Sequence, residues 1–302
     1  MCRTTPGPSK PEDLVHDGPS PAVLSDQPVL RVCDLSRRFG AGCPACDGGD
    51  PKKLEKNYCP VCGAVYAIQG VSFDLHRSEV LGIVGESGSG KSTILNCLYY
   101  DDQPTSGRAY LADFMQGNEC TFSVSPQRQR YIRNYLLGKV YQNPVLGLKM
   151  RFSSIANIAE KLIAAGSRHV GAMETRSREL LEHVNIPTFR MKEAPSTFSG
   201  GMQQRVQIAK ALSNNPPILL LDEVTTGLDL SVQAKVLDLI KQIQRELQIS
   251  MLLVSHDLAV VRMLADRTLV MLNGWIVERG LTDQILEDPQ HPYTQELVHS
   301  LL

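Results

Sequence analysis

The sequence predicts an α/β protein with strands buried on both faces. Residues 80–84, 217–221 and 251–254 are short, wholly apolar runs, as expected for strands covered on both sides. Helical patterns alternate with them: residues 93–100 follow the first run, and residues 232–247 form a long amphipathic helix after the second. Such alternation is typical of an α/β fold.

A glycine-rich loop joins the first strand to its helix. Residues 85–92 read Gly-Glu-Ser-Gly-Ser-Gly-Lys-Ser, the GxxxxGK(S/T) pattern of a phosphate loop. Its backbone N–H groups can turn inward around phosphates, Lys91 can reach the β and γ oxygens, and Ser92 can ligate Mg²⁺. A chance glycine-rich turn is the alternative, which the order of strand, loop and helix disfavours. We expect a nucleoside triphosphate site formed by Gly85, Glu86, Ser87, Gly88, Ser89, Gly90, Lys91, Ser92 and Thr93.

Two carboxylates follow the second buried strand. Asp222 is placed to hold Mg²⁺ from its outer coordination shell, and Glu223 is placed to polarise an attacking water. Two acids at this position can also be no more than a solvated strand end. The phosphate loop earlier in the chain favours the chemical interpretation.

The motif Ser-Gly-Gly-Met-Gln-Gln-Arg at residues 199–205 precedes the acidic strand, and with it the chain resembles the ABC-type ATPases. Further elements of that family match in order. Gln142 resembles the glutamine of the Q-loop, Asp229 the aspartate of the D-loop, and His256 the switch histidine. The resemblance covers residues 29–302.

The resemblance implies a nucleotide-binding domain with a P-loop core, a β subdomain and an inserted α-helical subdomain at residues 142–205. It also implies a homodimer, or a heterodimer with a second ABC ATPase, that sandwiches two ATP molecules. Ser199 and Gly201 of one subunit would face the γ-phosphate held by Lys91 of the other, since a helix start offers N–H dipoles to an anion. Hydrolysis would separate the subunits.

The catalytic roles are likewise implied by the resemblance. Gln142 would sense Mg²⁺ and the attacking water, and His256 would hold the γ-phosphate against Glu223. A lone histidine is more often a core or surface residue, but the place of His256 after a buried strand favours catalysis. One departure from the family pattern is Val224, at a position where the family usually has proline. This difference is expected to change the stiffness of the turn more than the chemistry of the site. The residues expected to contact ATP or Mg²⁺ outside the phosphate loop are Phe39, Gln142, Ser199, Gly200, Gly201, Asp222 and Asp229.

Two Cys-x-x-Cys pairs interrupt the family pattern at residues 43–63. Cys43 and Cys46 are separated by twelve residues from Cys59 and Cys62, which suits a tetrahedral thiolate site. We expect a small Cys₄ insertion resembling a zinc knuckle, with rubredoxin-like iron, disulfides and unliganded thiols as alternatives. The remaining cysteines have no such spacing and are expected to be packing residues or inert thiols: Cys2, Cys33, Cys97 and Cys120.

The insertion follows Phe39, which aligns with the aromatic residue that stacks on adenine in the family. An aromatic residue after a strand is by default part of the core, and the alignment favours stacking instead. The insertion is therefore expected to lie next to the adenine end of the nucleotide site. It could buttress Phe39 or form a docking surface.

The rest of the chain is organised around these motifs. Proline-rich residues 1–28 predict a flexible tail, and residues 30–35 and 71–75 predict strands of the nucleotide-binding sheet. Residues 142–195 are mostly helical in pattern. Residues 269–277 predict a hairpin that turns at Asn-Gly, and a last short helix is expected to open at the His-Pro-Tyr-Thr run near the C-terminus.

Composition narrows the class of protein. With 302 residues and a formal net charge of −1, the chain can bury a large core and has no electrostatic reason to bind nucleic acid. It has neither a long uncharged apolar run nor a signal-peptide pattern. We expect a cytoplasmic protein with no direct membrane insertion and no nucleic-acid partner.

Several stretches refine the resemblance. Residues 80–91, 197–205 and 291–294 are similar to the group that contains oligopeptide-type importer ATPases. Residues 165–171 and 184–187 look like the ATPase subunit of the carbon–phosphorus lyase system. That likeness implies an ATPase that docks on soluble lyase core subunits in phosphonate catabolism.

Two other functions stay open. The chain could instead drive membrane permeases for peptides or nickel, or it could be a nucleotide-gated scaffold with little turnover. The presence of Glu223 and His256 argues against the scaffold.

Overall fold

The computed structural model describes residues 27–46 and 54–299 of the chain. The tail predicted for residues 1–28 lies outside this range except for its last two residues. Within the described residues, no helix is both long enough and apolar enough to cross a lipid bilayer.

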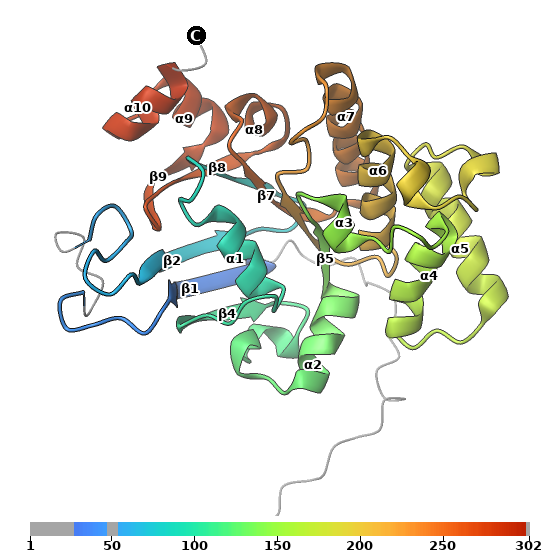
Figure 1. Cartoon of the computed structure of the whole chain (residues 1–302), viewed down its shortest axis with the longest axis horizontal. Helices are drawn as coiled ribbons and strands as arrows, with labels where there is room; N and C mark the ends of the chain where they lie inside the picture. The colour runs from blue at the N-terminus through green and yellow to red at the C-terminus, as the bar shows by residue number, and fades with distance from the viewer. Residues whose placement is uncertain (1–26, 47–53, 300–302) are drawn as a thin grey trace, which may run out of the picture.

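A six-stranded sheet forms the centre of the molecule (Figure 1). Neighbouring strands pair in parallel except for the last two, which form the predicted hairpin. The strand order is β5 (Leu137–Val140), β6 (Ile218–Asp222), β7 (Ser250–Ser255), β3 (Val80–Val84), β8 (Arg267–Leu272) and β9 (Trp275–Leu281). The three apolar runs are β3, β6 and β7, and every one of their residues is buried, as predicted.

A smaller antiparallel sheet has the order β2 (Val65–Leu75), β1 (Leu30–Phe39) and β4 (Ser106–Leu111). Strands predicted at residues 30–35 and 71–75 are present, but both are longer. Their pairing continues past irregularities in register until Phe39 stands opposite Val65. The residues between these two positions form the cysteine insertion, so its two ends are held side by side.

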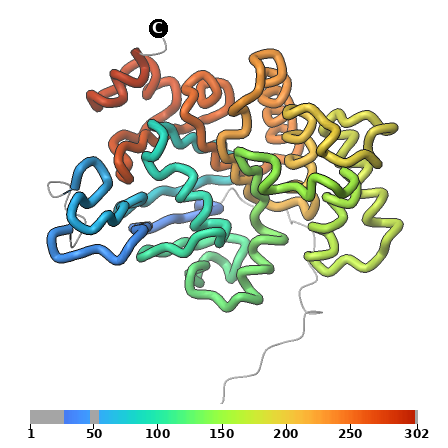
Figure 2. Tube along the Cα trace, viewed as in Figure 1, coloured from blue at the N-terminus to red at the C-terminus, as the bar shows by residue number. Residues whose placement is uncertain are grey.

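The helices surround the central sheet: α1 (Lys91–Leu98), α2 (Pro126–Tyr131), α3 (Pro144–Gly147), α4 (Ser154–Ala164), α5 (Val170–His183), α6 (Gly200–Ala211), α7 (Leu230–Leu247), α8 (Leu258–Leu264), α9 (Thr282–Glu287) and α10 (Pro292–His299). Helices α3 to α6 gather beyond β5, at the opposite end of the molecule from β1 and β2 (Figure 1). Figure 2 shows that the first strands and the last helices lie on the same side, although they are far apart in the sequence.

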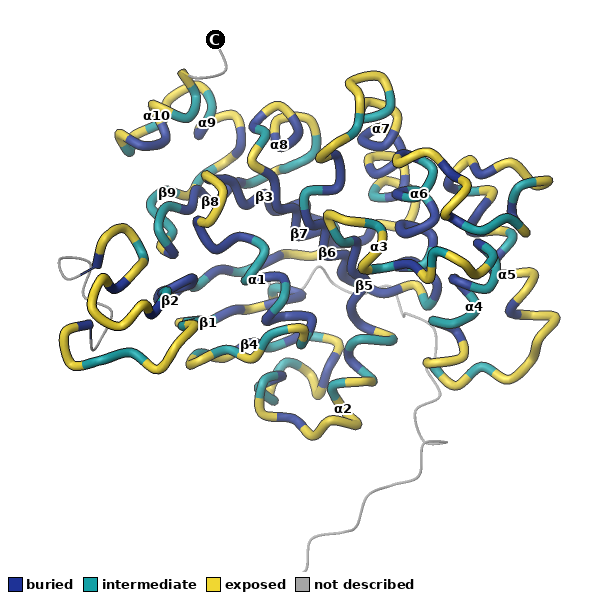
Figure 3. Tube along the Cα trace, in the orientation of Figure 1, coloured by how far each residue is buried: buried dark blue, intermediate teal, exposed yellow. Residues whose placement is uncertain are grey.

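Two hydrophobic cores lie on opposite faces of the central sheet. Leu81 and Ile83 of β3 belong to the core shared with β1, β2 and α1. Val80 and Val84 belong to the core shared with α6, α7 and α8. Because side chains alternate along a strand, a strand covered on both faces must be apolar throughout. The buried strands through the middle of Figure 3 follow this pattern.

Three helix boundaries differ from prediction, and the first is the start of α1 at Lys91, two residues before the predicted position. The helix expected at residues 93–100 is α1, which ends at Leu98 because Tyr100 has a positive φ of 62° that a helix cannot accommodate. Helix α7 starts two residues before the predicted position because the Asp229 carboxylate caps it, accepting a hydrogen bond from the Val232 N–H at 2.9 Å. The hairpin turn is as predicted: Asn273 has φ 49° and Gly274 has φ 87°.

Candidate nucleotide site and cysteine cluster

The phosphate loop connects β3 to α1 and is held from outside by β2 and by the β8–β9 turn. At Gly90, where φ is 103°, a Cβ atom would stand 2.0 Å from the Ala67 carbonyl oxygen. The Gly274 N–H donates to the Ser89 carbonyl at 3.0 Å. Position 90 therefore requires glycine both for its backbone angle and for the close approach of β2.

The Lys91 ammonium points back into the loop. It donates to the carbonyl oxygens of Gly85 and Glu86, both at 2.7 Å. Burial lowers the pKa of Lys91, and the nearby Glu223 and Asp222 carboxylates oppose that shift. A buried cation whose close partners are carbonyl oxygens is well suited to receive an anion.

Ser92 and Asp222 lie together where α1 begins and β6 ends. The Ser92 hydroxyl donates to Asp222 Oδ1 at 2.7 Å. Burial raises the pKa of Asp222, although this hydrogen bond acts in the opposite direction. A hydroxyl and a carboxylate side by side provide the oxygen ligands that Mg²⁺ prefers.

Three side chains converge on the Glu223 carboxylate, which follows β6. Glu223 Oε2 accepts hydrogen bonds from Gln142 Nε2 at 3.0 Å and from Thr226 Oγ1 at 3.1 Å, and it lies 3.1 Å from His256 Nδ1. The structure therefore brings together the three residues predicted to be catalytic. Thr226 was not predicted from the sequence. The turn after Glu223 folds the Thr226 side chain back onto the carboxylate, and the Thr226 N–H donates to the Glu223 carbonyl at 3.1 Å.

The motif at residues 199–205 is separate from this cluster. Ser199 and Gly200 are exposed at the start of α6. Gly201 is buried against α7, where a Cβ atom would stand 2.2 Å from Val232 Cγ1. Among the described residues, no backbone hydrogen bond joins this motif to the phosphate loop, and α6 and α1 lie well apart in Figure 1.

Phe39 ends β1 beside the cysteine insertion. Its side chain is 38% exposed, so it is not a core residue. The Arg37 guanidinium lies 4.3 Å from the centre of the Phe39 ring, as in a cation–π pair. The stacking of adenine on Phe39 stays a prediction.

A tyrosine that was not predicted to be functional contacts the phosphate loop. The Tyr293 hydroxyl of α10 accepts a hydrogen bond from the Glu86 N–H at 2.8 Å. Burial raises the pKa of Tyr293, which keeps the hydroxyl protonated. In the sequence, residues 291–294 predicted the start of the last helix and a family likeness. Nothing local indicates that the tyrosine of this run reaches the phosphate loop.

The four insertion cysteines meet at one point. All four sulfur atoms lie within 4.8 Å of one another, and three of the separations are 3.5, 3.7 and 3.9 Å. These separations exclude disulfides, whose S–S bond is about 2.05 Å. A tetrahedral Zn²⁺ with Zn–S distances of about 2.3 Å would have S–S edges of about 3.8 Å, so the cluster fits this ion. The four residues that could share such an ion are the ones predicted as ligands: Cys43, Cys46, Cys59 and Cys62.

The backbone around the cluster supports the same geometry. The Cys46 N–H donates to the Cys43 carbonyl at 3.0 Å, and the Gly63 N–H donates to the Cys59 carbonyl at 2.9 Å. The Tyr66 hydroxyl beside it lowers the pKa of Cys46 to about 6, which favours the metal-binding thiolate.

The other cysteines lie elsewhere. Burial raises the pKa of Cys97 to about 12, as expected for an inert thiol. Cys33 and Cys120 are free thiols, and Cys2 lies outside the described residues.

A phosphate loop, a strand-end carboxylate pair and a motif helix on this fold define an ATP-hydrolysing ABC subunit. The chain belongs to the ABC transporter family, whose model matches residues 68–226. It therefore binds and hydrolyses ATP, and ATP with Mg²⁺ is its expected substrate form.

Two curated relatives are informative. The chain is 47% identical over 232 residues to PhnK of Escherichia coli (strain K12), by its name a phosphonates utilization ATP-binding protein, covering 77% of this chain and 90% of PhnK. It is 39% identical over 252 residues to the oligopeptide transport ATP-binding protein OppD of Bacillus subtilis (strain 168), covering 83% of this chain and 70% of OppD.

A solved structure shares the fold. The ATP-binding cassette MJ0796, described as a dimer in a post-hydrolysis state bound to ADP and Pi, superposes with a TM-score of 0.69 at 27% identity. The match covers 84% of this chain and 98% of MJ0796.

Proposed function

We propose that this chain is the ATPase subunit of a phosphonate-degrading carbon–phosphorus lyase system. The observation that carries the proposal is the likeness to PhnK, which spans 90% of that protein at 47% identity, against 39% identity over 70% of OppD. In this function the chain supplies ATP-driven conformational change, and the soluble core subunits break the C–P bond.

Residues at the ends of β3, β6 and β7 carry out hydrolysis in this proposal. Lys91 exchanges its two carbonyl partners for the β and γ oxygens of ATP, since its ammonium already lies inside the loop. Glu223 orients and polarises the attacking water, and His256 holds the γ-phosphate against it. Bound Mg²⁺ would neutralise phosphate charge; Ser92, Asp222 and Gln142 are the residues that would hold it.

Dimerisation completes the site. Ser199 and Gly200 are exposed on α6, away from the phosphate loop of the same chain, which supports their use on the nucleotide of a partner subunit. MJ0796, which is described as a dimer bound to ADP and Pi, supports dimerisation. ATP added to the Glu223→Gln variant should trap a dimer on a sizing column. A persistent monomer would mean that a different ABC ATPase supplies the second half-site.

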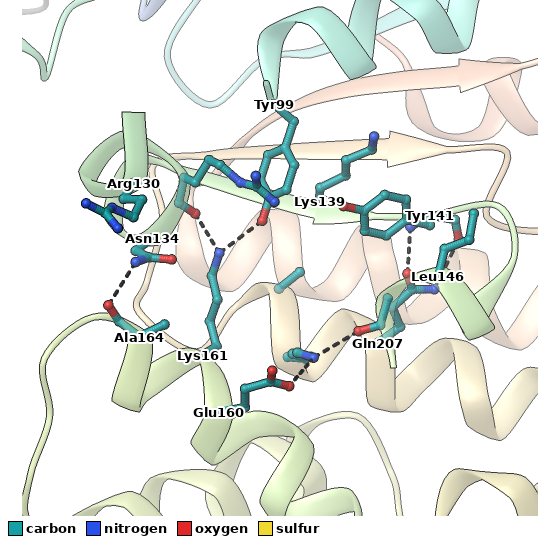
Figure 4. A pocket seen from close by; sticks show the side chains of 14 residues that line it. Tyr99, Arg130, Asn134, Lys139, Tyr141, Leu146, Glu160, Lys161, Ala164 and Gln207 are labelled. Atoms are coloured by element: carbon teal, nitrogen blue, oxygen red, sulfur yellow. Dashed lines mark hydrogen bonds and ion pairs between the residues drawn. The ribbon is translucent and has the colours of Figure 1, made fainter. Parts of the chain in front are cut away.

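We propose that the lyase core docks beside Gln142. A cavity of about 520 Å³ lies between the central sheet and α3, α4 and α6, and it includes Tyr141, the neighbour of Gln142 (Figure 4). Within it the Lys161 ammonium donates to the Tyr99 hydroxyl at 3.0 Å. Five of its six charged lining residues are cationic: Arg130, Arg133, Lys139, Lys161 and Lys210.

The rim of this cavity includes an exposed apolar side chain, Leu146 of α3. Two more apolar residues are exposed on and shortly after the same helix, Val145 and Phe152. A partner with carboxylates for the cavity and apolar side chains for the rim fits this surface. Because Gln142 contacts Glu223, a partner docked here would be linked directly to the site of hydrolysis.

We further propose that the four cysteines bind one structural Zn²⁺ per chain. The separations of the sulfur atoms support zinc.

Capture of partners tests the function. The purified chain, passed through a lysate of its source with and without ATP, should retain soluble lyase core subunits. The Arg130→Glu variant should capture less of them while hydrolysing ATP normally, since Arg130 is exposed and remote from the acid pair. Membrane permease subunits in the eluate would instead support the importer function that the OppD likeness favours.

A further inference from the structure

One side chain of the cysteine insertion reaches the phosphate loop. Asn57, which lies between the two cysteine pairs, donates from Nδ2 to the Gly88 carbonyl oxygen at 3.3 Å. The Asn57 carbonyl in turn accepts a hydrogen bond from the Tyr66 N–H at 2.7 Å. Since Tyr66 belongs to β2, the Asn57 backbone is fixed to the sheet while its side chain extends to the loop.

Besides backbone hydrogen bonds to β2 and within its own turn, the insertion has few apolar contacts to keep it in place. Its hydrophobic cluster is small: Cys46, Leu54, Cys59, Ala64 and Tyr66. A segment of this size does not bury enough apolar surface to hold its shape, and units below about 40 residues usually need a metal or disulfides. Two members of the cluster are themselves predicted metal ligands, so an ion shared by the four sulfurs would add to the backbone contacts that hold the turn at Asn57.

The contact with Gly88 also determines the direction of the next N–H group. The C=O and N–H of a trans peptide point in opposite directions, and the described chain has no cis peptide. Asn57 holds the Gly88 carbonyl on the outside of the loop, so the Ser89 N–H is directed inward. That N–H donates to the Glu86 carbonyl at 3.2 Å, the oxygen that also accepts from the Lys91 ammonium.

We propose that a metal ion bound by the four cysteines holds Asn57 against Gly88 and so keeps the phosphate loop ready for nucleotide. Asn57 is a positioning residue that acts through the Ser89 N–H, which shares the Glu86 carbonyl oxygen with Lys91 and would turn with it toward a bound phosphate. The inference rests on ATP binding at this loop and on the proposed zinc site. The inference does not depend on the phosphonate function, so an experiment can contradict either proposal without contradicting the other.

Loss of the Asn57 amide should weaken nucleotide binding. The Asn57→Ala variant should bind a fluorescent ATP analogue about three- to tenfold more weakly, as expected for one neutral hydrogen bond. Its zinc content should be unchanged. The KM for ATP should rise while kcat stays constant, because Glu223 and His256 are untouched. Asn57→Gln, which keeps the amide donor, should recover part of the affinity.

Metal removal provides the second arm of the test. Wild type and Asn57→Ala are each measured with zinc bound and after chelation, with metal content checked by elemental analysis and folding by thermal unfolding. Chelation should weaken ATP binding of wild type by the same factor as Asn57→Ala and should add no loss to that variant. Tyr58→Phe, which removes an exposed hydroxyl from the same turn, should bind ATP as wild type does.

Three results would overturn the inference. Zinc-loaded Asn57→Ala could bind the analogue as tightly as wild type, chelation could weaken both proteins equally, or the purified chain could contain no metal. Chelation could unfold the whole chain. In that case the comparison of zinc-loaded wild type with zinc-loaded Asn57→Ala still tests the inference, because equal affinities of the two proteins for the ATP analogue would contradict the role of Asn57.

Discussion

The nucleotide site and the cysteine insertion are ordered by different forces. The nucleotide site lies at the ends of strands whose every residue is buried between two large cores. The insertion has one small cluster and closes on four sulfur atoms that all lie within 4.8 Å of one another. Apolar burial thus shapes the first region, whereas the second is the one for which we propose a shared ion. A substitution in the nucleotide site should therefore leave the zinc content unchanged, and a substitution in the insertion should leave ATP binding largely intact.

The largest effect should come from chemistry in the first region. Glu223→Gln should lower ATP hydrolysis at least about a hundredfold, because the group that accepts from Gln142 and Thr226 can no longer act as a base. Zinc content should not change. Steady-state phosphate release measures the rate, with exposed Glu287→Gln as control. Equal rates in the two variants would favour a nucleotide-gated scaffold.

The reciprocal change acts on the second region. Cys43→Ser combined with Cys62→Ser should reduce zinc from about one ion per chain to none, because two thiolate ligands are lost. ATP binding should persist and weaken no more than about tenfold, the effect expected of the Asn57 contact. Elemental analysis of freshly purified, reduced protein measures the metal. Cys120→Ser should retain zinc, and zinc retained by the double variant would contradict the assignment of the ligands.

A packing change should affect the large core and leave the cysteine cluster unchanged. Gly201→Ala would bring a Cβ atom to 2.2 Å from Val232 Cγ1, so α6 and α7 must move apart. The free energy of unfolding should fall by about 1 to 3 kcal/mol, measured by urea denaturation, while zinc content stays the same. Gly171→Ala is the control, since its nearest neighbour is a His169 ring atom at 3.3 Å. Equal stabilities of the two variants would show that the α6–α7 contact relaxes freely.

The smallest effect should come from the contact of α10 with the phosphate loop. Tyr293→Phe removes the acceptor of the Glu86 N–H and should raise the KM for ATP about two- to fivefold. Tyr110→Phe on β4 is the matched control. Tyr293 and Asn57 contact the loop at different residues, so the double variant should show the product of the two effects. An unchanged KM would mean that the loop keeps its shape without α10.

Most of the fold could be predicted because its signals are local. The wholly apolar runs correspond to β3, β6 and β7, and Asn273 and Gly274 form the expected hairpin turn. The convergence of Gln142 and His256 on Glu223 was anticipated only through the family resemblance. Spacing along the chain does not indicate that a loop after β5 meets the end of β6.

The sequence by itself determined the chemistry of both regions. A strand, a glycine loop and Lys91 are neighbours in the chain, and so are the cysteines of each Cys-x-x-Cys pair, so local geometry alone aims their groups at one ligand. Only the tertiary structure decided how these sites are held. Tyr293 and Asn57 lie 207 and 31 residues from the loop residues they contact. Such contacts depend on how whole sheets and helices pack, which no local pattern records.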